Sequence, residues 1–483
     1  MVAFVISRVA IRQAGLIFDL RPLNNGFQLL GVDDLRRDLL GSLLHLHQQP
    51  PLYNLFIGLA VRAPLGSQPT LFEDIYLIMG VVLALALYAV LLRLRLHWVS
   101  AAALAVLFTI SPSALLYENW LLYDYLVTLL VVLTVFALLR YVDGERLGSL
   151  ALFVSLLAVL VLTRSLFQLA WLLLWVVVLV VRHRRRDWRR VVLVSAVPVL
   201  AVLAVYANTL RIAGSFTSST SFGIGLAKIT TFQLPVSERR AMVNRGELSP
   251  LALIPPFKRI SAYDRVVPPG KPTGIPVLDE ELKHGPGSRP YINFNNLRYA
   301  QLSSLYLKDA VRTVRRHPEA YLKGMEHSFT IYFRPSSDFF ALARARQSIA
   351  DYTRHYNTWV YGVTDAGLGQ SRLPSDRLGY DTGPARTAWT VLLLYLAALL
   401  GGGWELARAW RSRRGPRLAG PHPLVVAFLW STIGYITLVS NLFEIGENSR
   451  FRLYADPLAL ALVGSLISGW VRRRRRSRTG QPG

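Results

Sequence analysis

The chain has 483 residues, a formal net charge of +25 and a mean hydropathy of +0.35, with 52% hydrophobic residues. This hydropathy is high for a soluble protein and low for a chain that lies entirely within a membrane. The absence of cysteine excludes disulfides, thiolate metal ligands and a cysteine nucleophile. We therefore expect a polytopic membrane protein with a sizeable aqueous part that folds by packing alone.

The basic residues gather in short blocks between apolar runs, and this placement decides what the net charge means. A nucleic-acid footprint spreads over one face of a folded domain, whereas the cytoplasmic loops of membrane proteins accumulate Lys and Arg. We interpret the blocks as topology signals and expect no nucleic-acid partner. Arg greatly outnumbers Lys, which is typical of a GC-rich bacterial genome and favours the bacterial cytoplasmic membrane as the location.

Ten apolar runs approach the roughly 18 to 20 residues that a helix needs to cross about 30 Å of hydrocarbon. The first run, Met1 to Phe18, carries Arg8 and Arg12 and lacks a small-residue cleavage site, so we expect a retained anchor rather than a signal peptide. The predicted spans are 1–18, 76–94, 99–116, 120–139, 148–163, 165–182, 191–209, 387–408, 423–441 and 451–471.

Connecting these spans in order places every basic block on one side, which the positive-inside rule assigns to the cytoplasm. The blocks are Arg93 to His97, Arg140 to Arg146, Arg182 to Arg190, Arg408 to Arg417 and Arg472 to Arg478. The outer side then receives the loop 19–75, the turn at Glu118, the loop 210–386 and the stretch Phe443 to Arg450. Every conspicuous acidic turn is therefore predicted to face outward.

The loop 210–386 is long enough to form a domain of its own. Within it, residues 298–333 show helical spacing that is broken at Pro318, and residues 251–290 are rich in Pro and Gly, which favours irregular loop. We predict a membrane module 1–209, an extracytoplasmic mixed domain or cap 210–386, a three-span module 387–471 and a basic cytoplasmic tail 472–483. The stretch 50–66 is too short and too amphipathic to cross, and we expect it to lie in the outer interface.

Polar side chains gather in the first outer loop. Asp19 directly follows the first span, Asp33 and Asp34 come later, and His47 and Gln49 precede a Pro-Pro pair. A carboxylate at a membrane surface can act as a general base towards an acceptor hydroxyl, while His or Arg can stabilise charge on a leaving phosphate. The alternative for each Asp is an ordinary solvated residue on an amphipathic helix.

A second polar group lies at the next outer turn. Glu118 and Asn119 stand at the mouth of two spans, and Asp124 lies deeper in the following helix. A carboxylate in or beside hydrocarbon is costly, so we expect these acids to face a polar cavity or a cation. A helix-to-helix hydrogen bond is the alternative for Asp124.

A third polar group precedes the last span, where Glu447 is followed by Arg450 and Arg452. Arginine matches phosphate geometry and stays charged, so this outward pair favours a lipid phosphate, with snorkelling to ordinary headgroups as the alternative. Two weaker candidates are Arg164, in a tight outward turn, and the small polar segment Ser218 to Lys228, whose backbone N–H groups could cradle a phosphate.

The stretches HQQPPLYN (47–54), YENWLLYD (117–124) and GENSRFRLYADP (446–457) together resemble the GT-C superfamily of membrane glycosyltransferases. The likeness is greatest to the branch of protein O-mannosyltransferases and bacterial lipid A aminoarabinose transferases, and it covers about two thirds of the chain. Such enzymes take a sugar from a polyprenyl-monophosphate donor on the outer face. No GxGxxG, P-loop, HExxH or GxSxG motif is present, which agrees with a donor that is not a nucleotide.

The resemblance implies a GT-C-like all-α membrane fold and a role for each matching residue. Asp19, or failing it Asp33 or Asp34, would be the base that activates the acceptor. Glu118 would position the acceptor or a divalent metal ion, Mg or Mn, although no cofactor is required by the motifs. His47, Gln49, Arg450 and Arg452 would hold the donor phosphate. The acceptor would be an envelope glycan, lipid or protein.

Two other functions fit part of the pattern. An O-antigen ligase or polymerase also has about ten to twelve spans, a large outer loop and outward arginines, but it uses diphosphate-linked donors. A transporter of lipid-linked glycans predicts polar residues in mid-span and broken helices in matched halves, whereas the polar groups here cluster at the outer mouths.

Overall fold

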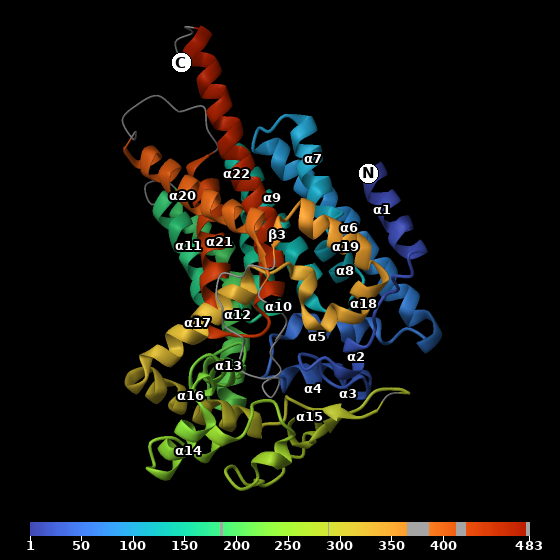
Figure 1. Cartoon of the computed structure of the whole chain (residues 1–483), viewed down its shortest axis with the longest axis vertical. Helices are drawn as coiled ribbons and strands as arrows, with labels where there is room; N and C mark the ends of the chain where they lie inside the picture. The colour runs from blue at the N-terminus through green and yellow to red at the C-terminus, as the bar shows by residue number, and fades with distance from the viewer. Residues whose placement is uncertain (184–186, 288, 365–385, 412–421, 480–483) are drawn as a thin grey trace.

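The computed structural model describes residues 1–183, 187–287, 289–364, 386–411 and 422–479, and it is built almost entirely of helices (Figure 1). Residues 184–186 and 412–417 of two predicted basic blocks, residues 365–385 of the predicted outer domain and residues 480–483 of the predicted tail lie outside the described residues. The expectation of an all-α protein with several apolar helices is confirmed.

The part of the chain before residue 214 combines long apolar helices with short helices in the first loop and at the turn before residue 123. They are α1 (Val2–Gln13), α2 (Pro22–Asn25), α3 (Val32–Arg37), α4 (Leu39–Leu44), α5 (Pro51–Ala60), α6 (Gln68–Arg93), α7 (Trp98–Thr109), α8 (Pro112–Glu118), α9 (Tyr123–Gly144), α10 (Leu147–Thr163), α11 (Leu169–His183) and α12 (Trp188–Ala213). The short helix predicted in 50–66 is therefore α5, which begins at Pro51 and packs against α4 and α10.

The segment from 214 to 364 contains shorter elements. They are α13 (Phe222–Ile229), α14 (Val236–Asn244), α15 (Pro276–Asp279), β1 (Leu282–Lys283), β2 (Tyr291–Ile292), α16 (Arg298–Arg316), α17 (Pro318–Tyr332), α18 (Ala343–Ser348), α19 (Ala350–Trp359) and β3 (Val363–Thr364). The predicted break at Pro318 is confirmed, because α16 ends and α17 begins there. The expected mixed domain is instead mainly helical in its described part, with only the two-residue antiparallel pairs β1–β2 and β3–β4, β4 being Thr387–Ala388.

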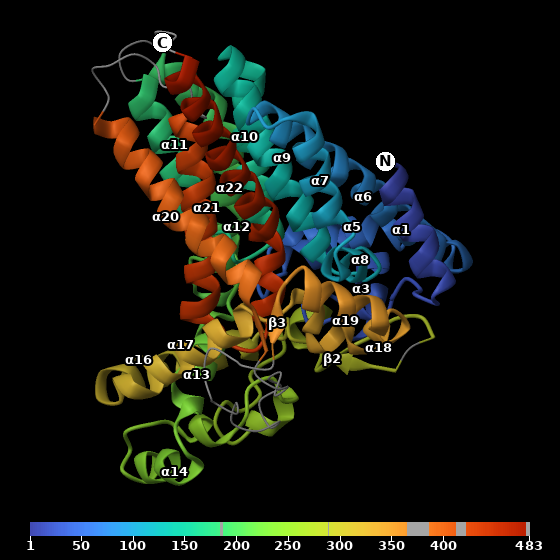
Figure 2. The ribbon, with the colours of Figure 1, turned by 45° about the horizontal axis from the view of Figure 1, so that its top comes forward.

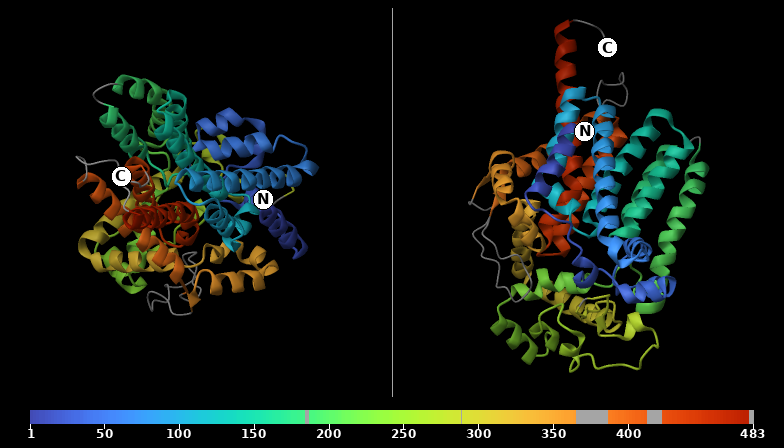
Figure 3. Two further views of the ribbon diagram at one scale, coloured as in Figure 1. Left: turned by 90° about the horizontal axis from the view of Figure 1, so that it is seen from above. Right: turned by 90° about the vertical axis from the view of Figure 1, so that its right-hand side faces the viewer.

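Three long helices complete the chain, namely α20 (Trp389–Arg411), α21 (Pro423–Phe443) and α22 (Asn448–Thr479). They lie beside α9 to α12 in one bundle, as two views show (Figure 2, Figure 3). Each of the ten apolar runs in the sequence overlaps one of the helices α1, α6, α7, α9, α10, α11, α12, α20, α21 and α22, and the run 99–116 also covers most of α8.

Six helices in the described part of the chain are long and apolar enough to cross a membrane: α6, α9, α12, α20, α21 and α22. A seventh crossing results if α7 and α8, which meet at 59°, count as one broken span. The bend has a local cause, since Pro112 opens α8 and the Ser111 hydroxyl caps it by accepting from the Ala114 N–H at 3.1 Å. The apolar helices α5, α10 and α11 are shorter.

The basic turns meet at one end of the bundle. Arg93 pairs with Asp143 at the end of α9, Arg182 pairs with Glu145, and Arg473 of α22 pairs with Glu405 of α20. Such contacts connect loops that are far apart in sequence. The predicted clustering of the basic blocks on one side therefore agrees with the arrangement of the helices.

The predicted outer segments meet at the opposite end, where α13 to α16 lie (Figure 1). This region has a core of its own that includes Ile224, Phe232, Leu251, Phe294 and Leu302. It is tied to the first loop through Phe27, which packs against Phe257 and Phe294 with ring centroids 5.7 and 6.0 Å apart. The elements at this end surround the candidate site.

Candidate functional site

Two cavities lie side by side at this end of the bundle. The Asp19 cavity has a volume of about 470 Å³ and is lined by Asp19, Arg21, Pro22, Asn25, Gly26, Phe27, Gln28, Trp120, Leu122, Tyr291, Phe339, Phe340, Ala341, Ala343, Arg344, Glu447 and Arg450. The Arg164 cavity has a volume of about 630 Å³. Its lining includes Gln49, Arg164, Leu166, Ser219, Thr220, Ser221, Gly223, Tyr435, Val439, Phe443, Glu444 and Phe451. Phe27 and Glu447 line both cavities, so they form a shared wall.

The backbone places Asp19 in its cavity. The Asp19 N–H donates to the Asn119 carbonyl at 2.8 Å, and the Asp19 carbonyl accepts from the Leu121 N–H at 3.1 Å. The carboxylate accepts from Arg21 Nε at 2.8 Å and from Arg21 Nη2 at 2.6 Å. The side chain is only 11% exposed, so this pairing with Arg21 holds the carboxylate at the cavity wall.

Aromatic rings cover much of the Asp19 cavity. Trp120 and Phe339 pack with ring centroids 5.8 Å apart, and Phe340 follows at 4.6 Å from Phe339. Two acids, Asp19 and Glu447, lie among these rings. Aromatic faces beside carboxylates can bind a polar ligand such as a sugar through its apolar faces and its hydroxyls.

Arg450 is buried at the back of the Asp19 cavity. Its Nε lies 3.4 Å from Asp124 Oδ1, and its Nη2 lies 3.3 Å from Glu447 Oε2. The same Nη2 donates to the Tyr123 hydroxyl at 2.7 Å. Tyr454 also donates to Asp124. Asp124 is thus the buried counter-ion of Arg450, which agrees with the expectation that it faces a cation.

Arg164 has a different environment. It follows α10, donates to the Tyr123 hydroxyl and stacks over the rings of Tyr123 and Phe451 at 4.4 and 4.9 Å. Its Nε has no hydrogen-bond partner, and no carboxylate of the described chain forms an ion pair with it. Burial lowers the pKa of Arg164 to about 10, so the guanidinium is still charged at neutral pH. A buried cation that lines a cavity without its own anion can take an anionic ligand.

The wall facing Arg164 is polar and contains the start of α13. Ser221 is the N-cap residue, and Ser219, Thr220 and Gly223 also line the cavity. The side-chain Oε1 of Gln49, which is 6% exposed, lines this cavity and has no hydrogen-bond partner. The beginning of α13 carries partial positive charge and adds to the charge of Arg164, while Gln49, Glu444 and Glu447 contribute acceptor oxygens to the same lining.

The rim of the Arg164 cavity is apolar. Leu166, Tyr435 and Val439 line it, and Phe222 and Phe443 stand at its edge with exposed fractions of 48% and 37%. These residues belong to α13, α21 and the turn before α11. The cavity therefore combines an anion-binding wall with an apolar approach from the helices of the bundle.

His47 does not line either cavity. Its ring is fully buried between the Thr220 hydroxyl at 2.9 Å and the Asn295 carbonyl at 2.8 Å. Burial lowers the pKa of His47 to about 4, so the ring is neutral at physiological pH. His47 was expected to hold the donor phosphate, but in this structure both of its ring nitrogens are hydrogen-bonded inside the protein, and it ties the first loop to the segment before α13 and to Asn295.

Glu118 also has a structural environment. It pairs with Arg8, with Nε 2.9 Å from Oε1, and accepts from the Tyr125 hydroxyl at 2.6 Å. Gly80 of α6 leaves the space for these groups. Glu118 was expected to position an acceptor or a metal ion. In this structure it lines neither cavity, and its oxygens accept from Arg8 and Tyr125 in an ion pair that joins helices. No group of three His, Asp or Glu side chains in the described residues could hold a metal ion.

Arg452 lines neither cavity. It lies 3.8 Å from Asp456, and its Nη2 donates to the Ser336 hydroxyl at 3.1 Å. Tyr395 donates to the same Asp456 at 3.0 Å. Arg450 and Arg452 were expected to hold the donor phosphate together, but they lie in different surroundings. Arg450 lines a cavity, and Arg452 is a buried link between α22, α20 and the turn after α17.

The remaining candidates lie near the site without lining it. Asp33 and Asp34 are in the first turn of α3, where the Asp33 N–H donates to the His284 carbonyl at 3.3 Å. Asn119 supplies its backbone carbonyl to Asp19. Lys228 pairs with Glu444, which lines the Arg164 cavity. The structure thus groups Asp19, Glu447 and Arg450 in one cavity and Arg164 and Gln49 in the other.

Several residues of the site were not singled out from the sequence. Tyr123 joins the two arginines, Phe27 divides the cavities, and Arg21 pairs with Asp19. Trp120 and Phe339 supply the aromatic wall. Tyr123 stands beside Asp124 and could have been weighed with it, but Phe27 and Phe339 carry no sequence signal that separates them from ordinary core aromatics.

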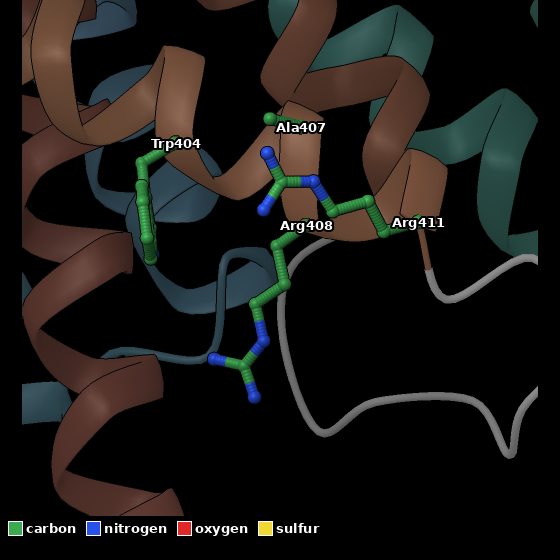
Figure 4. A pocket seen from close by; sticks show the side chains of 4 residues that line it. All are labelled: Trp404, Ala407, Arg408 and Arg411. Carbon is green, nitrogen blue, oxygen red and sulfur yellow. The ribbon is translucent and has the colours of Figure 1, made fainter.

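A third hollow, of about 400 Å³, lies at the other end of the bundle on α20 (Figure 4). It is lined by Trp404, Ala407, Arg408 and Arg411. This composition is typical of a membrane interface, where Trp and Arg anchor helix ends, and it contains no acid or nucleophile. We therefore assign the candidate site to the two cavities at the opposite end.

Comparison of the chain with protein-family models, with curated proteins and with solved structures gives no match.

Proposed function

We propose that the protein is an integral membrane glycosyltransferase of the GT-C type that moves a sugar from a polyprenyl-monophosphate donor to an acceptor on the outer face of a bacterial cytoplasmic membrane. In this proposal all ten apolar helices cross or enter the bilayer, and the end that carries α13 to α16 faces outward. The clustering of the basic turns at the other end supports this orientation.

The donor is assigned to the Arg164 cavity. The phosphate would lie between the Arg164 guanidinium and the start of α13, and the polyprenyl chain would leave past Phe222 and Phe443. Arg164 supplies charge-assisted hydrogen bonds to the phosphate, and the helix start adds backbone dipoles. One buried cation without its own counter-ion suits a monophosphate better than a diphosphate.

The acceptor is assigned to the Asp19 cavity. The sugar carbon that reacts would lie at the shared wall of Phe27 and Glu447. The acceptor oxygen attacks the anomeric carbon, the bond from that carbon to the phosphate oxygen breaks, and polyprenyl phosphate leaves with the electron pair. The acceptor proton passes to the Asp19 carboxylate, which is paired with Arg21. Arg164 stabilises the charge that develops on the leaving phosphate.

The observation that carries this proposal is the pair of adjoining cavities, one with the Asp19 carboxylate and the other with a buried arginine that forms no ion pair with a carboxylate of the described residues. A displacement reaction needs a base on one side of the sugar and a cationic phosphate site on the other. The shared wall of Phe27 and Glu447 supports the assignment of these two functions to neighbouring cavities.

The test is turnover of radiolabelled polyprenyl-monophosphate sugars by the full-length protein in nanodiscs, with envelope extract as acceptor. Asp19→Asn should lower turnover by about a hundredfold or more, since general-base catalysis contributes on the order of 10² to 10⁴. Asp33→Asn, a change of the same kind in the same loop, should leave turnover within about twofold.

Two results would contradict the proposal. If no polyprenyl-monophosphate sugar is consumed and diphosphate-linked donors are, the protein belongs with the O-antigen ligases or polymerases. If Asp19→Asn turns over as fast as wild type while remaining folded, the Asp19 cavity is not the acceptor site.

A further inference from the structure

One hydroxyl connects the two cavities. The Tyr123 oxygen accepts a hydrogen bond from Arg164 and another from Arg450, at 2.7 Å for Arg450. Arg164 lines only the Arg164 cavity, and Arg450 lines only the Asp19 cavity. The phenol is therefore the direct contact between the cationic groups of the two sites.

Tyr123 is held where it can carry out this role. It is the first residue of α9, its side chain is 2% exposed, and its ring packs edge-on against Tyr53 at 5.4 Å. The two guanidinium carbons lie 4.4 and 5.6 Å from its ring. The ring cannot move away from either arginine without disturbing this packing, so the position of one guanidinium depends on the other.

The two arginines differ in what else holds them. Arg450 has two carboxylates, Asp124 and Glu447, within 3.4 Å. Among the described residues, the Arg164 guanidinium has one hydrogen-bond partner, the Tyr123 hydroxyl, and it stacks over the rings of Tyr123 and Phe451. A phosphate that binds the unpartnered Nε–H of Arg164 shifts the guanidinium as a whole, and this changes the hydrogen bond that its Nη1 donates to the Tyr123 hydroxyl, which Arg450 shares.

We propose that Tyr123 is a positioning residue that couples binding of a polyprenyl monophosphate at Arg164 to the placement of Arg450 in the acceptor cavity. This inference rests on the proposed function. Binding of the two substrates is then cooperative. A ligand in one cavity changes the affinity of the other cavity for its own ligand, and the reverse effect has the same factor.

A second route between the cavities runs through Glu447, which lines both and pairs with Arg450. The Tyr123→Phe variant separates the two routes, since it removes the shared hydroxyl and leaves Glu447 and the ring packing in place. The matched control is Tyr53→Phe, since the Tyr53 ring packs against the Tyr123 ring. This variant removes the buried Tyr53 hydroxyl, which lies 2.9 Å from the Tyr76 hydroxyl.

The experiment is a double-mutant cycle on the affinity of the full-length protein in nanodiscs for decaprenyl monophosphate. Arg450→Lys should change the Kd by at least about threefold in the wild-type background, although Arg450 does not line the cavity that holds the phosphate. In the Tyr123→Phe background the same change should alter the Kd by less than about twofold. In the Tyr53→Phe background the effect of Arg450→Lys should equal that in wild type.

A second measurement needs no change at Arg450. Decaprenyl monophosphate should slow hydrogen exchange in the segment 447–452 of wild type and of Tyr53→Phe, and should not do so in Tyr123→Phe. Additive effects in the cycle, or equal protection in Tyr123→Phe, would overturn the coupling while the observed binding still supports the donor site. If wild type does not bind decaprenyl monophosphate at all, the proposed function fails and the coupling with it.

Discussion

Arg8 and Glu118 form a buried bidentate ion pair that joins α1 to the end of α8. Their side chains are 11% and 4% exposed, respectively. Breaking such a pair from one side leaves an uncompensated charge and costs about 3 to 5 kcal/mol. Glu118→Ala should therefore lower the melting temperature strongly in nanodiscs, while the molecules that remain folded keep normal turnover.

The control for this ion pair lies on the same helix. Arg12 pairs with Glu73, but these side chains are 70% and 32% exposed. An exposed pair contributes about 0 to 1 kcal/mol, so Arg12→Ala should hardly change the melting temperature. If Glu118→Ala retained full stability and lost turnover, Glu118 would belong to the reaction after all.

Arg164→Gln should weaken binding of polyprenyl monophosphate about 10- to 100-fold, because a hydrogen bond to a charged group contributes roughly 1.5 to 3 kcal/mol. The measurement is a titration of decaprenyl monophosphate against protein in nanodiscs. Arg211→Gln removes the same charge from the exposed end of α12 and should leave the affinity within about twofold. Equal losses for both variants would indicate a general surface-charge effect instead of a phosphate site.

His47 should make the protein acid-sensitive. Burial holds its pKa at about 4 in the folded chain, against 6.5 when it is exposed. The unfolded chain therefore binds more protons between these values, and stability should fall as the pH drops from about 6.5 to about 4 and level off below that. The loss has an upper limit of about 3 kcal/mol.

The check is the melting temperature as a function of pH for wild type and His47→Asn. The variant should lose stability at pH 7, because its side chain cannot reproduce both ring hydrogen bonds, but its profile between pH 4 and 6.5 should be flatter. His355→Asn, which changes an exposed histidine, should keep the wild-type profile. An unchanged slope in His47→Asn would contradict the assignment.

Asp34 should act in the opposite direction. Burial, with a contribution from Glu280, raises its pKa to about 6, above the usual 3.8. The folded chain then binds more protons than the unfolded chain, so this group lowers stability as the pH rises from about 4 to 6. Asp34→Asn should match wild type near pH 4 and melt at a higher temperature above pH 6, whereas Asp33→Asn should show no such crossover.

The helices of the bundle could be predicted from the sequence because long apolar runs without charges have few other stable arrangements. The first outer loop was predicted less well. His47 and Glu118 are polar residues beside membrane segments, and such residues can either face a ligand or neutralise each other inside the protein. The choice depends on partners, Asn295 for His47 and Arg8 for Glu118, that lie far away in the sequence.

The site itself depends on three-dimensional neighbours. Arg450 and Arg452 stand two residues apart, yet one lines a cavity and the other is enclosed by Ser336 and Asp456. On a helix such neighbours point about 200° apart, so only one of them can face a given cavity. The position of Asp19 was easier to anticipate, because the end of the first apolar run fixes it at the membrane surface.

The pairing of Arg450 with Tyr123, 327 residues earlier in the chain, also bears on how the protein is made. Asp124 enters the membrane with α9 during synthesis, but its partner arrives only when α22, the last helix, follows. Until then the acid is a buried group without its cation, and α22 brings an arginine that hydrocarbon alone would not accept. Insertion of α22 is thus the step that completes the Asp19 cavity, and a nascent chain cut short before it would leave Asp124 and Tyr123 without Arg450.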